Sequence, residues 1–328
     1  MEYRRLGKSG LKLSALSYGA WITFHTQADE NLVYQLMTKA FDHGVNFFDN
    51  AEAYAEGNAE KIMGNVLKRT GWNRSNFVVS TKIFWGRTGI NGSGLSYKHI
   101  LEGTHSALKR LQLEYVDLIF CHGPDANTSI EETVWAMNQV IRQGKAFYWG
   151  TSNWSAEQIL KAYNFARQEH LIPPLMEQPQ YNLFHRDKVE NTLSPLRQKI
   201  GLGITTWSPL DNGLLSGKYN DGIPKDSRLA LKELTWLRKH LEIEGMQKKI
   251  KKTLLLQNVA NDLGASLPQL AIAWCLINSN VSSVITGASK PEQIDENMKA
   301  LEIVPKLNKE VLNKIDEIMN NKPASEMD

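Results

Sequence analysis

Three largely apolar runs in the first half of the chain each stop at a polar residue that is able to do chemistry. Residues 45–48 lead to Asp49, residues 77–81 lead to Lys82, and residues 116–121 lead to His122. Short runs rich in β-branched and aromatic residues are typical of buried strands. If these strands lie parallel in one sheet, an acid, a base and an imidazole meet at one edge, together with Tyr54, which follows Asp49 by five residues.

Segments with apolar residues at helical spacing separate the expected strands. Ser129 and Glu132 match a capping box, and Gly44 is expected to end the first helix. Helices are predicted after Asp29, over 59–68, from Ser96 to about 111, after Ser129, after Ser155 and over 189–199, with two more helical segments beyond residue 207. The other strands are expected at 13–18, 147–150, 175–178, 203–207 and 281–286, with a hairpin over residues 3–14 ahead of the main fold.

This alternation predicts an α/β fold of eight strands, each followed by helix. No Pro-, Gly- or Ser-rich linker divides the chain, so a single domain is expected over residues 1–328. Eight repeats favour a closed (β/α)8 barrel, the TIM barrel, over a doubly wound sheet, and such barrels hold active sites at the carboxyl ends of their strands. The expected strands end in polar or functional residues, which are Asp49, Lys82, His122, Ser152, Asn153, Gln178, Trp207, Ser208, Gly287 and Ser289.

Composition indicates an ordinary globular chain, with 42% hydrophobic and 22% charged residues. The formal net charge of +3 gives no general attraction to nucleic acid or to an anionic membrane surface. The densest basic run, residues 248–252, is interpreted as a solvated helix face. Cys121 and Cys275 both lie in apolar segments, so they are interpreted as buried, reduced thiols.

No apolar segment of the sequence indicates a signal peptide or a membrane span. The first five residues lack the apolar core of a signal peptide, and the longest nearly apolar segment, residues 267–277, is too short to span a bilayer. We therefore expect a cytoplasmic protein with no membrane insertion and no nucleic-acid partner.

The residue types at the expected strand ends suit proton transfer to a carbonyl oxygen. A buried Lys82 ammonium beside Tyr54 is expected to lower the tyrosine pKa from its ordinary value of about 10, with Asp49 holding Lys82 charged. His122 is expected to titrate near physiological pH, and either to hydrogen-bond the substrate oxygen or to relay a proton. Together the four residues suggest a tyrosine general acid. None of them is an electron source, so hydride must come from a cofactor.

Taken alone, each of these residues is explained at least as well by a structural role. Asp49 and Lys82 are equally consistent with an ion pair, Tyr54 with a rim aromatic, and His122 with an ordinary strand-end histidine. Their coincidence at adjacent strand ends favours a site. Other motifs fail, because no G-x-G-x-x-G follows a strand, residues 213–219 are one residue short of a P-loop, and no zinc-ligand spacing occurs, so no metal is expected.

With these residues in place, the chain resembles the aldo-keto reductase superfamily over its whole length. That family's tetrad of Asp, Tyr, Lys and His matches Asp49, Tyr54, Lys82 and His122. The resemblance is greatest to the potassium-channel β-subunit branch and its bacterial aldo/keto reductase relatives. The stretches that carry it are 3–11, 81–86, 111–117, 148–152 and 267–276.

The resemblance implies NADPH bound in an extended pose across the rim of the barrel. It also implies a cyclic homo-oligomer, a tetramer or an octamer. Within the family pattern, Ser152, Asn153 and Gln178 hold the carboxamide, and Trp207 packs on the nicotinamide. The cofactor-binding positions that it implies are Ala20, Trp21, Gln27, Asp49, Ser152, Asn153, Gln178, Trp207, Ser208, Pro209, Leu210, Lys218, Arg228, Gly287, Ser289, Gln293, Glu296 and Asn297.

Three departures from the family pattern bear on function. Gln293 stands where many reductases carry an arginine near the ribose phosphate, so a preference for NADP must rest on Ser289 and other groups. His122 stands where channel β-subunits carry asparagine, which resembles the catalytically competent members. The Asp211–Asn212 pair is atypical, as is the loop at His25.

Two functions from different classes follow. The first is NADPH-dependent reduction of an aldehyde or ketone, the small-molecule carbonyl substrate, to an alcohol. The alternative is an NADP(H)-binding regulatory β-subunit of a voltage-gated potassium channel with slow or incidental chemistry. A cofactor-binding barrel kept only as an assembly scaffold is a third reading.

Overall fold

The computed structural model describes residues 1–86, 89–225 and 227–324, and the side chains of Arg228, Glu233 and His240 lie outside that description. The chain divides into two compact units. The first, which we call the barrel unit, comprises residues 1–179, 192–206 and 280–294. The second, which we call the helical unit, comprises residues 180–191, 207–279 and 295–328.

Eight parallel strands close into a barrel within the barrel unit, in the order β10-β3-β4-β5-β6-β7-β8-β9. The predicted (β/α)8 barrel is therefore confirmed. Each strand pairs with its neighbours in sequence, and β10 closes the ring by pairing with both β3 and β9. The strands are β3 (Leu16–Gly19), β4 (Phe47–Asp49), β5 (Val78–Ile83), β6 (Val116–Cys121), β7 (Ala146–Ser152), β8 (Met176–Gln178), β9 (Gly203–Thr206) and β10 (Val281–Thr286).

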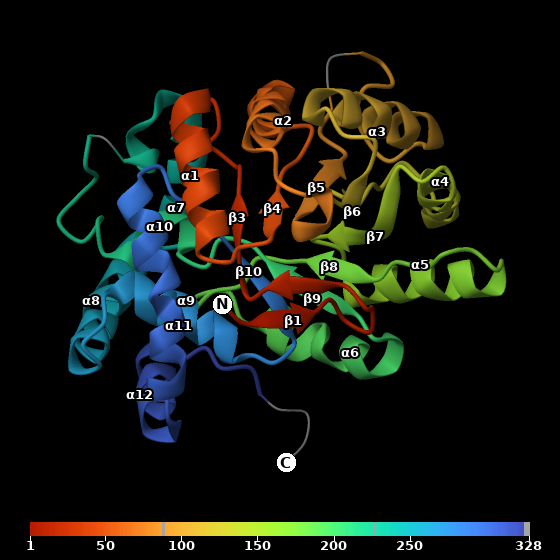
Figure 1. Ribbon diagram of the computed structural model, residues 1–328. Coiled ribbons are helices and arrows are strands. Elements are labelled where there is room, and N and C mark those ends of the chain that lie inside the picture. The colour runs from red at the N-terminus through yellow and green to blue at the C-terminus, as the bar shows by residue number, and fades with distance from the viewer. Residues whose placement is uncertain (87–88, 226, 325–328) are drawn as a thin grey trace. The chain divides into compact units, whose positions relative to one another are not determined.

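Helices connect successive strands and cover the outside of the sheet, as Figure 1 shows for α2, α3 and α4 beside β5, β6 and β7. These helices are α1 (Glu30–Asp42), α2 (Asn58–Thr70), α3 (Tyr97–Leu111), α4 (Ile130–Arg142), α5 (Ala156–Gln168) and α6 (Ser194–Ile200). Side chains at the predicted N-caps Asp29, Ser96, Ser129 and Ser155 each accept a hydrogen bond from the backbone N–H three residues on. These bonds satisfy donors that would otherwise be left over at the helix starts.

The predicted capping box at Ser129 forms only in part. Ser129 Oγ accepts from the Glu132 N–H, but the Glu132 carboxylate accepts instead from the Tyr97 N–H at 2.8 Å, at the start of α3. A complete capping box occurs at Ser155, where Gln158 Oε1 accepts from the Ser155 N–H. The sequence pattern was therefore right about the start of α4 and wrong about where the glutamate bonds.

The predicted hairpin consists of β1 (Tyr3–Arg5) and β2 (Lys12–Ser14), which pair antiparallel. Its contacts fall at residues that begin or precede strands: Arg4 donates to the Val281 carbonyl, and the Lys8 N–H donates to the Gly201 carbonyl at 3.0 Å. Gly7 has a φ of +55°, and a Cβ there would lie 2.3 Å from the Gly201 oxygen. Only glycine fits this close approach, and the hairpin covers the amino end of the barrel.

The barrel interior changes from apolar to polar along the strands. Phe47, Val78 and Met176 belong to one buried cluster that also contains Leu6, Leu13, Leu118, Phe120 and Ile285. Since side chains two residues apart on a strand share a face, Asp49 and Gln178 face the same interior, at the carboxyl end. The same alternation of side chains that fills the core therefore brings the polar side chains at the strand ends together at the carboxyl end of the barrel.

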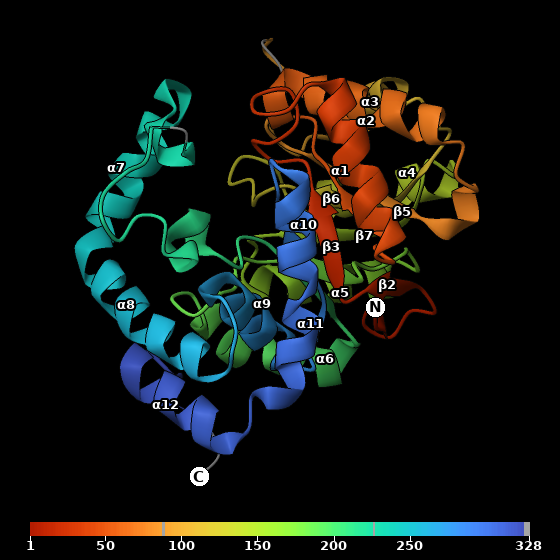
Figure 2. The ribbon, with the colours of Figure 1, turned by 60° about the vertical axis from the view of Figure 1, so that its left-hand side comes forward.

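Within the described part of the chain, the helical unit contains five α-helices, four longer ones and the short α11. Its longest helix, α8, packs against α9 and α12, and Figure 2 shows α8 beside α12. The helices are α7 (Thr235–Ile243), α8 (Met246–Asp262), α9 (Leu267–Ile277) and α12 (Lys309–Met319), while α10 (Pro291–Met298) and the short α11 (Ala300–Ile303) follow β10. Among the described residues, no helix has the length and apolar character needed to cross a membrane.

Three sequence predictions need correction here. The helix expected over 189–199 is two segments, a π-helical turn at Lys188–Thr192 and α6 from Ser194, because Pro195 lacks an N–H and is therefore tolerated in the first turn of a helix but not in its interior. The stretch after residue 207 holds α7, α8 and α9 instead of two helical segments. The basic run 248–252 is not wholly solvated, since Lys249 is buried.

Candidate active site

Lys82 is the centre of the polar cluster at the carboxyl end of the barrel. Its side chain is fully buried on β5, and its Nζ donates to Asp49 Oδ2 at 2.5 Å, to the Asn50 carbonyl at 2.9 Å and to Tyr54 Oη at 3.1 Å. An ammonium group has three N–H donors, so all three are used. Burial lowers the pKa of Lys82, but the Asp49 charge, together with Tyr54 and the hydrogen bonds to both residues, more than offsets this, and the net shift is upward. Lys82 is therefore a fixed cation.

Asp49 is oriented by more than its ion pair with Lys82. Its second oxygen, Oδ1, accepts from Ser80 Oγ at 2.7 Å and from Gln178 Nε2 at 3.1 Å. The side chains of Asp49, Ser80, Lys82 and Gln178, which come from three strands, thus form one bonded arrangement. The predicted role of Asp49, to hold Lys82 charged and in place, agrees with this geometry.

Tyr54 projects from a strained loop that follows β4. Ala55 and Glu56, directly after it, have φ values of +48° and +55°, in the left-handed region that non-glycine residues rarely occupy. Such residues persist where surrounding contacts fix them, and they gather at functional sites. One such contact is made by Glu56, whose N–H donates to the Ala53 carbonyl at 3.2 Å.

The pKa of Tyr54 moves in the direction opposite to the sequence prediction. Burial of the phenol raises the pKa, the Lys82 charge lowers it, and the Asp49 charge raises it again, so the net shift is above the ordinary value. The prediction of a lowered pKa was wrong because it counted Lys82 without the desolvation and without the carboxylate behind it. Tyr54 is consequently a protonated hydroxyl at neutral pH.

His122 follows β6 and faces Tyr54. The two ring centroids are 5.6 Å apart, with the planes at 73°. Burial, followed by the Lys82 charge, holds the pKa of His122 well below its ordinary value, so the expectation that it titrates near physiological pH was wrong. His122 Nδ1 is buried and has no hydrogen-bond partner among the described residues. A neutral imidazole with an unused ring nitrogen suits hydrogen bonding to a substrate oxygen.

Sequence reasoning missed a second layer behind the tetrad. The carboxylate of Glu52 accepts from His99 Nε2 at 3.0 Å as well as from the Phe84 backbone, and both Glu52 and His99 are buried. Glu52 lies between Asp49 and Tyr54 in the sequence, which was the available signal. His99 lies inside α3, where nothing in the sequence distinguishes it from a surface histidine.

The loop after β3 holds the predicted cofactor positions Ala20, Trp21 and Gln27. The Ala20 N–H donates to the Asp49 carbonyl at 2.9 Å, so this loop is tied to the tetrad strand. Trp21 and Gln27 are half-buried on the same loop. Ile22 has a φ of +64°, which is unusual for a β-branched residue. The loop is thus another strained segment at a strand's carboxyl end.

The predicted carboxamide-binding residues end two adjacent strands. Ser152 Oγ donates to the Gln178 carbonyl at 2.8 Å, and Asn153 Nδ2 lies 3.4 Å from Ser152 Oγ. Asn153 is exposed and left-handed, with φ at +62°. Its amide, with the Gln178 amide on the neighbouring strand, offers the mixture of donors and acceptors that a primary carboxamide needs.

The turn between β10 and α10 gathers donors around one oxygen. Gln293 Oε1 accepts from the Ser289 N–H at 2.8 Å, from the Lys290 N–H at 3.2 Å and from Ser289 Oγ at 3.4 Å. Gly287 precedes them, and a Cβ there would meet open space. Backbone N–H groups at a helix start, beside a lysine, also suit an anionic oxygen, so these residues fit a phosphate group.

The remaining predicted cofactor positions lie in the helical unit. Asn182 Nδ2 donates to the Ser208 carbonyl at 2.8 Å, and Ser208 Oγ accepts from the Asn212 N–H at 2.9 Å. Glu296 Oε1 accepts from Gln269 Nε2 at 2.8 Å. Trp207, Pro209, Leu210, Lys218 and Asn297 are described in this unit, whereas the side chain of Arg228 lies outside the described part of the chain.

Comparison with known proteins places the chain in a family. The model of the aldo/keto reductase family matches residues 15–320, so the chain belongs to the aldo/keto reductase family, a family of oxidoreductases. It is 54% identical over 324 residues to a protein of Arabidopsis thaliana described as a probable voltage-gated potassium channel subunit beta, with 98% of each chain covered. A protein of Oryza sativa subsp. japonica with the same description matches equally, at 54% and 98%. The predicted resemblance is confirmed.

Proposed function

We propose that this protein reduces an aldehyde or ketone to an alcohol with NADPH. The observation that carries the proposal is the triple contact of Lys82, whose ammonium bonds Asp49, the Asn50 carbonyl and the Tyr54 hydroxyl at the carboxyl end of a barrel. Membership in the aldo/keto reductase family supports the same chemistry.

When bound, NADPH supplies the hydride that the protein's own residues cannot. Ser152, Asn153 and Gln178 are the residues that would hold its carboxamide, and Ser289 with Lys290 would hold its 2′-phosphate. The donor sets described above support both assignments. By the family pattern, Trp207 would pack on the nicotinamide, and Ser208 and Lys218 would line the path of the pyrophosphate.

In this proposal Tyr54 gives its proton to the carbonyl oxygen as that oxygen becomes negative. The raised pKa keeps Tyr54 protonated in the resting state, and the Lys82 ammonium 3.1 Å away stabilises the phenolate that remains. The neutral His122 imidazole donates a hydrogen bond to the same substrate oxygen and orients it.

The test follows absorbance loss of NADPH against a panel of aldehydes and ketones, with alcohol products identified. Tyr97→Phe is the control for loss of a tyrosine hydroxyl outside the site, since Tyr97 lies at the start of α3 and is 40% exposed. We expect turnover with at least one carbonyl class in the wild type and in the control. If no carbonyl in a broad panel is reduced by wild-type protein that binds NADPH, the proposed reaction is wrong.

A second function is favoured by the relatives described as probable channel β-subunits. In that case the protein is a regulatory subunit in which bound NADP(H) reports redox state and hydride transfer is slow. Single-turnover oxidation of bound NADPH in wild type and His122→Asn separates the two. The reductase proposal predicts fast wild-type transfer, slowed roughly 10²–10³-fold by His122→Asn, as expected when one positioned hydrogen-bond donor to the substrate oxygen is displaced. Equal, slow rates in both proteins support the regulatory function.

A further inference from the structure

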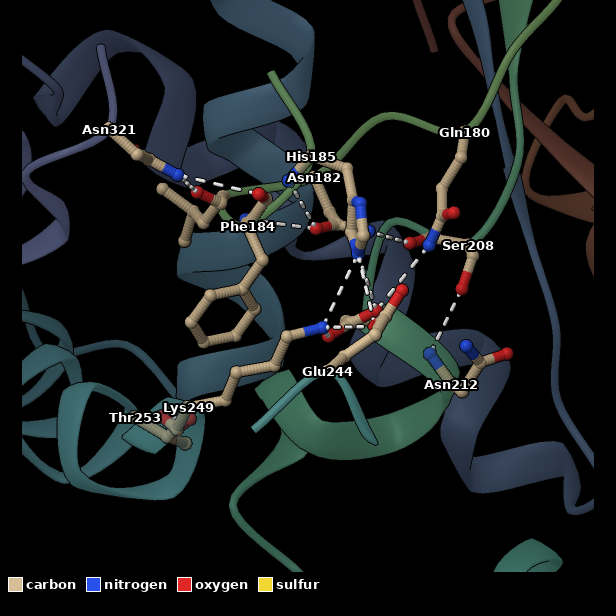
Figure 3. A network of polar contacts seen from close by, with 12 residues as sticks. Gln180, Asn182, Phe184, His185, Ser208, Asn212, Glu244, Lys249, Thr253 and Asn321 are labelled. Atoms are coloured by element: carbon tan, nitrogen blue, oxygen red, sulfur yellow. Dashed lines mark hydrogen bonds and ion pairs between the residues drawn. The ribbon is translucent and has the colours of Figure 1, made fainter. Parts of the chain in front are cut away.

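Lys249 of α8 reaches into a cluster of charged side chains in the helical unit. Its Nζ lies 2.9 Å from Asp211 Oδ2, 2.6 Å from Glu244 Oε2 and 3.3 Å from His185 Nε2. Figure 3 shows the lysine stem running past Phe184 toward Glu244 and His185. The Nζ also lies 5.2 Å from the centroid of the Phe184 ring.

The three partners of Lys249 form the kind of group that binds a metal ion. The nearest ligand atoms of His185, Asp211 and Glu244 lie within 4.8 Å of one another. The Lys249 ammonium, however, contacts all three. The positive charge that these three residues surround is therefore the ammonium group of Lys249.

Asp211, the deepest member of the cluster, depends on that cation. It is fully buried, and burial alone would raise its pKa. The hydrogen bond from His185 and the charge of Lys249 outweigh burial and hold the pKa of Asp211 below its ordinary value. A buried carboxylate without such partners is strongly disfavoured, so the Asp211 charge is kept in place by His185 and Lys249 together.

The backbone around Asp211 is strained. Asp211, Asn212 and Gly213 have consecutive φ values of +43°, +56° and +98°, and Ser208 has +56°. Only glycine adopts this region without penalty. The Asp211 N–H donates to the Ser208 carbonyl at 3.0 Å, and the Asn212 N–H donates to Ser208 Oγ at 2.9 Å. Ser208 is thus held by the same residues whose conformation is strained.

We propose that Lys249 is a positioning residue that locks the segment 208–213, with Ser208 and residues 211–213 in their left-handed conformation, so that Ser208 and Lys218 are held ready for the cofactor pyrophosphate. The part concerning pyrophosphate rests on the proposed function, while the locking of the loop does not. Lys218 is connected to the locked segment directly, since a Cβ at Gly213 would lie 2.9 Å from Lys218 Cε. This role explains the atypical pair Asp211–Asn212, because Asp211 is the residue of the segment that forms the ion pair with Lys249.

The first experiment measures amide hydrogen exchange in the protein without cofactor. Lys249→Met should accelerate exchange in peptides covering 208–217 by about tenfold or more, and leave peptides of the barrel strands unchanged. Lys248→Met is the matched control, because Lys248 is the preceding residue of the same helix and is exposed, and it should exchange like the wild type. Unchanged exchange at 208–217 in Lys249→Met would overturn the proposal.

A milder variant keeps the test decisive if Lys249→Met does not fold. Glu244 is partly exposed, and the substitution Glu244→Gln removes the charge of only one of the partners of Lys249. This variant should fold, and exchange in the same peptides should be several-fold faster than in the wild type. If Glu244→Gln exchanges like the wild type while Lys249→Met fails to fold, Lys249 is a general stability residue and the proposal is wrong.

The second experiment measures dissociation constants by fluorescence titration. Lys249→Met should weaken NADPH binding tenfold or more, yet leave binding of adenosine 2′-monophosphate, which has no pyrophosphate, within twofold of wild type. Accelerated loop exchange with an unchanged NADPH constant would overturn the pyrophosphate role. Wild-type protein that binds no NADPH would overturn the proposed function instead, and the hydrogen-exchange result would still decide whether Lys249 locks the loop.

Discussion

The barrel unit and the helical unit each bury a lysine against an aspartate, and the two lysines differ in what else they hold. Lys82 bonds Asp49 at 2.5 Å and gives its last N–H to the Tyr54 hydroxyl. Lys249 bonds Asp211 at 2.9 Å and also faces a second carboxylate, on Glu244.

The count of carboxylates decides what each lysine can do. Beside Lys82 there is one negative partner and one neutral phenol, so the positive charge still stabilises a new negative charge on Tyr54. Lys249 already has two carboxylates within 3 Å, at 2.9 and 2.6 Å, and so serves to hold them. A buried Lys–Asp pair is thus not itself a sign of catalysis, and the third partner distinguishes the two uses.

The largest expected effect is on turnover at the first lysine. Lys82→Met should reduce kcat for carbonyl reduction by roughly 10²–10⁴-fold, because the phenolate left by proton transfer loses its counterion. The NADPH dissociation constant should change little. Lys249→Met should show the reverse pattern, with a raised KM for NADPH and a kcat near wild type. Steady-state kinetics on both variants measures kcat and the KM for NADPH. Equal losses of kcat in the two variants would contradict the different roles assigned to the two lysines.

Stability should separate the two aspartates next. Asp49→Asn leaves a fully buried lysine without its counterion, which costs about 3–5 kcal/mol in the free energy of unfolding. Asp211→Asn leaves Lys249 with Glu244 and a side chain that is 11% exposed, so we expect about 1–3 kcal/mol. Urea unfolding measures both, and a larger loss for Asp211→Asn would contradict the comparison.

The same contrast explains how far the sequence could predict the molecule. The barrel and the tetrad were predictable because each tetrad residue ends or follows a strand, and parallel strands bring their ends together. Lys249 could not be predicted, because it lies in a basic run and meets Asp211 from 38 residues away through helix packing. The pKa directions of Tyr54 and His122 also required structure, since desolvation depends on burial and outweighed the charges that the sequence makes visible.

The pH dependence follows from those two shifts. A group with a raised pKa keeps its proton to higher pH, so reduction by Tyr54 should hold constant from about pH 6 to 9. The reverse oxidation needs the phenolate and should rise about tenfold per pH unit below the Tyr54 pKa. Because the pKa of His122 lies well below its ordinary value, no midpoint should occur near pH 6.5. Initial rates in both directions across this range would reveal such a midpoint.

The smallest expected effect is cofactor preference. The Ser289 and Lys290 donors should favour NADPH over NADH by about tenfold, or roughly 1.4 kcal/mol, as expected for one charge-assisted hydrogen bond. Fluorescence titration of the wild type with both cofactors measures the ratio, and Ser289→Ala should reduce it. Equal dissociation constants in the wild type would remove the assignment of these donors.

The claim that Tyr54 is the proton donor is tested most directly by Tyr54→Phe. Phenylalanine keeps the ring beside His122 and removes only the hydroxyl that Lys82 contacts at 3.1 Å. The measurement is stopped-flow oxidation of protein-bound NADPH by an aldehyde that the wild type reduces, in a single turnover that excludes cofactor release. We predict a rate at least 10²-fold below wild type with an unchanged NADPH dissociation constant. A Tyr54→Phe rate within a few-fold of wild type would show that the proton comes from elsewhere.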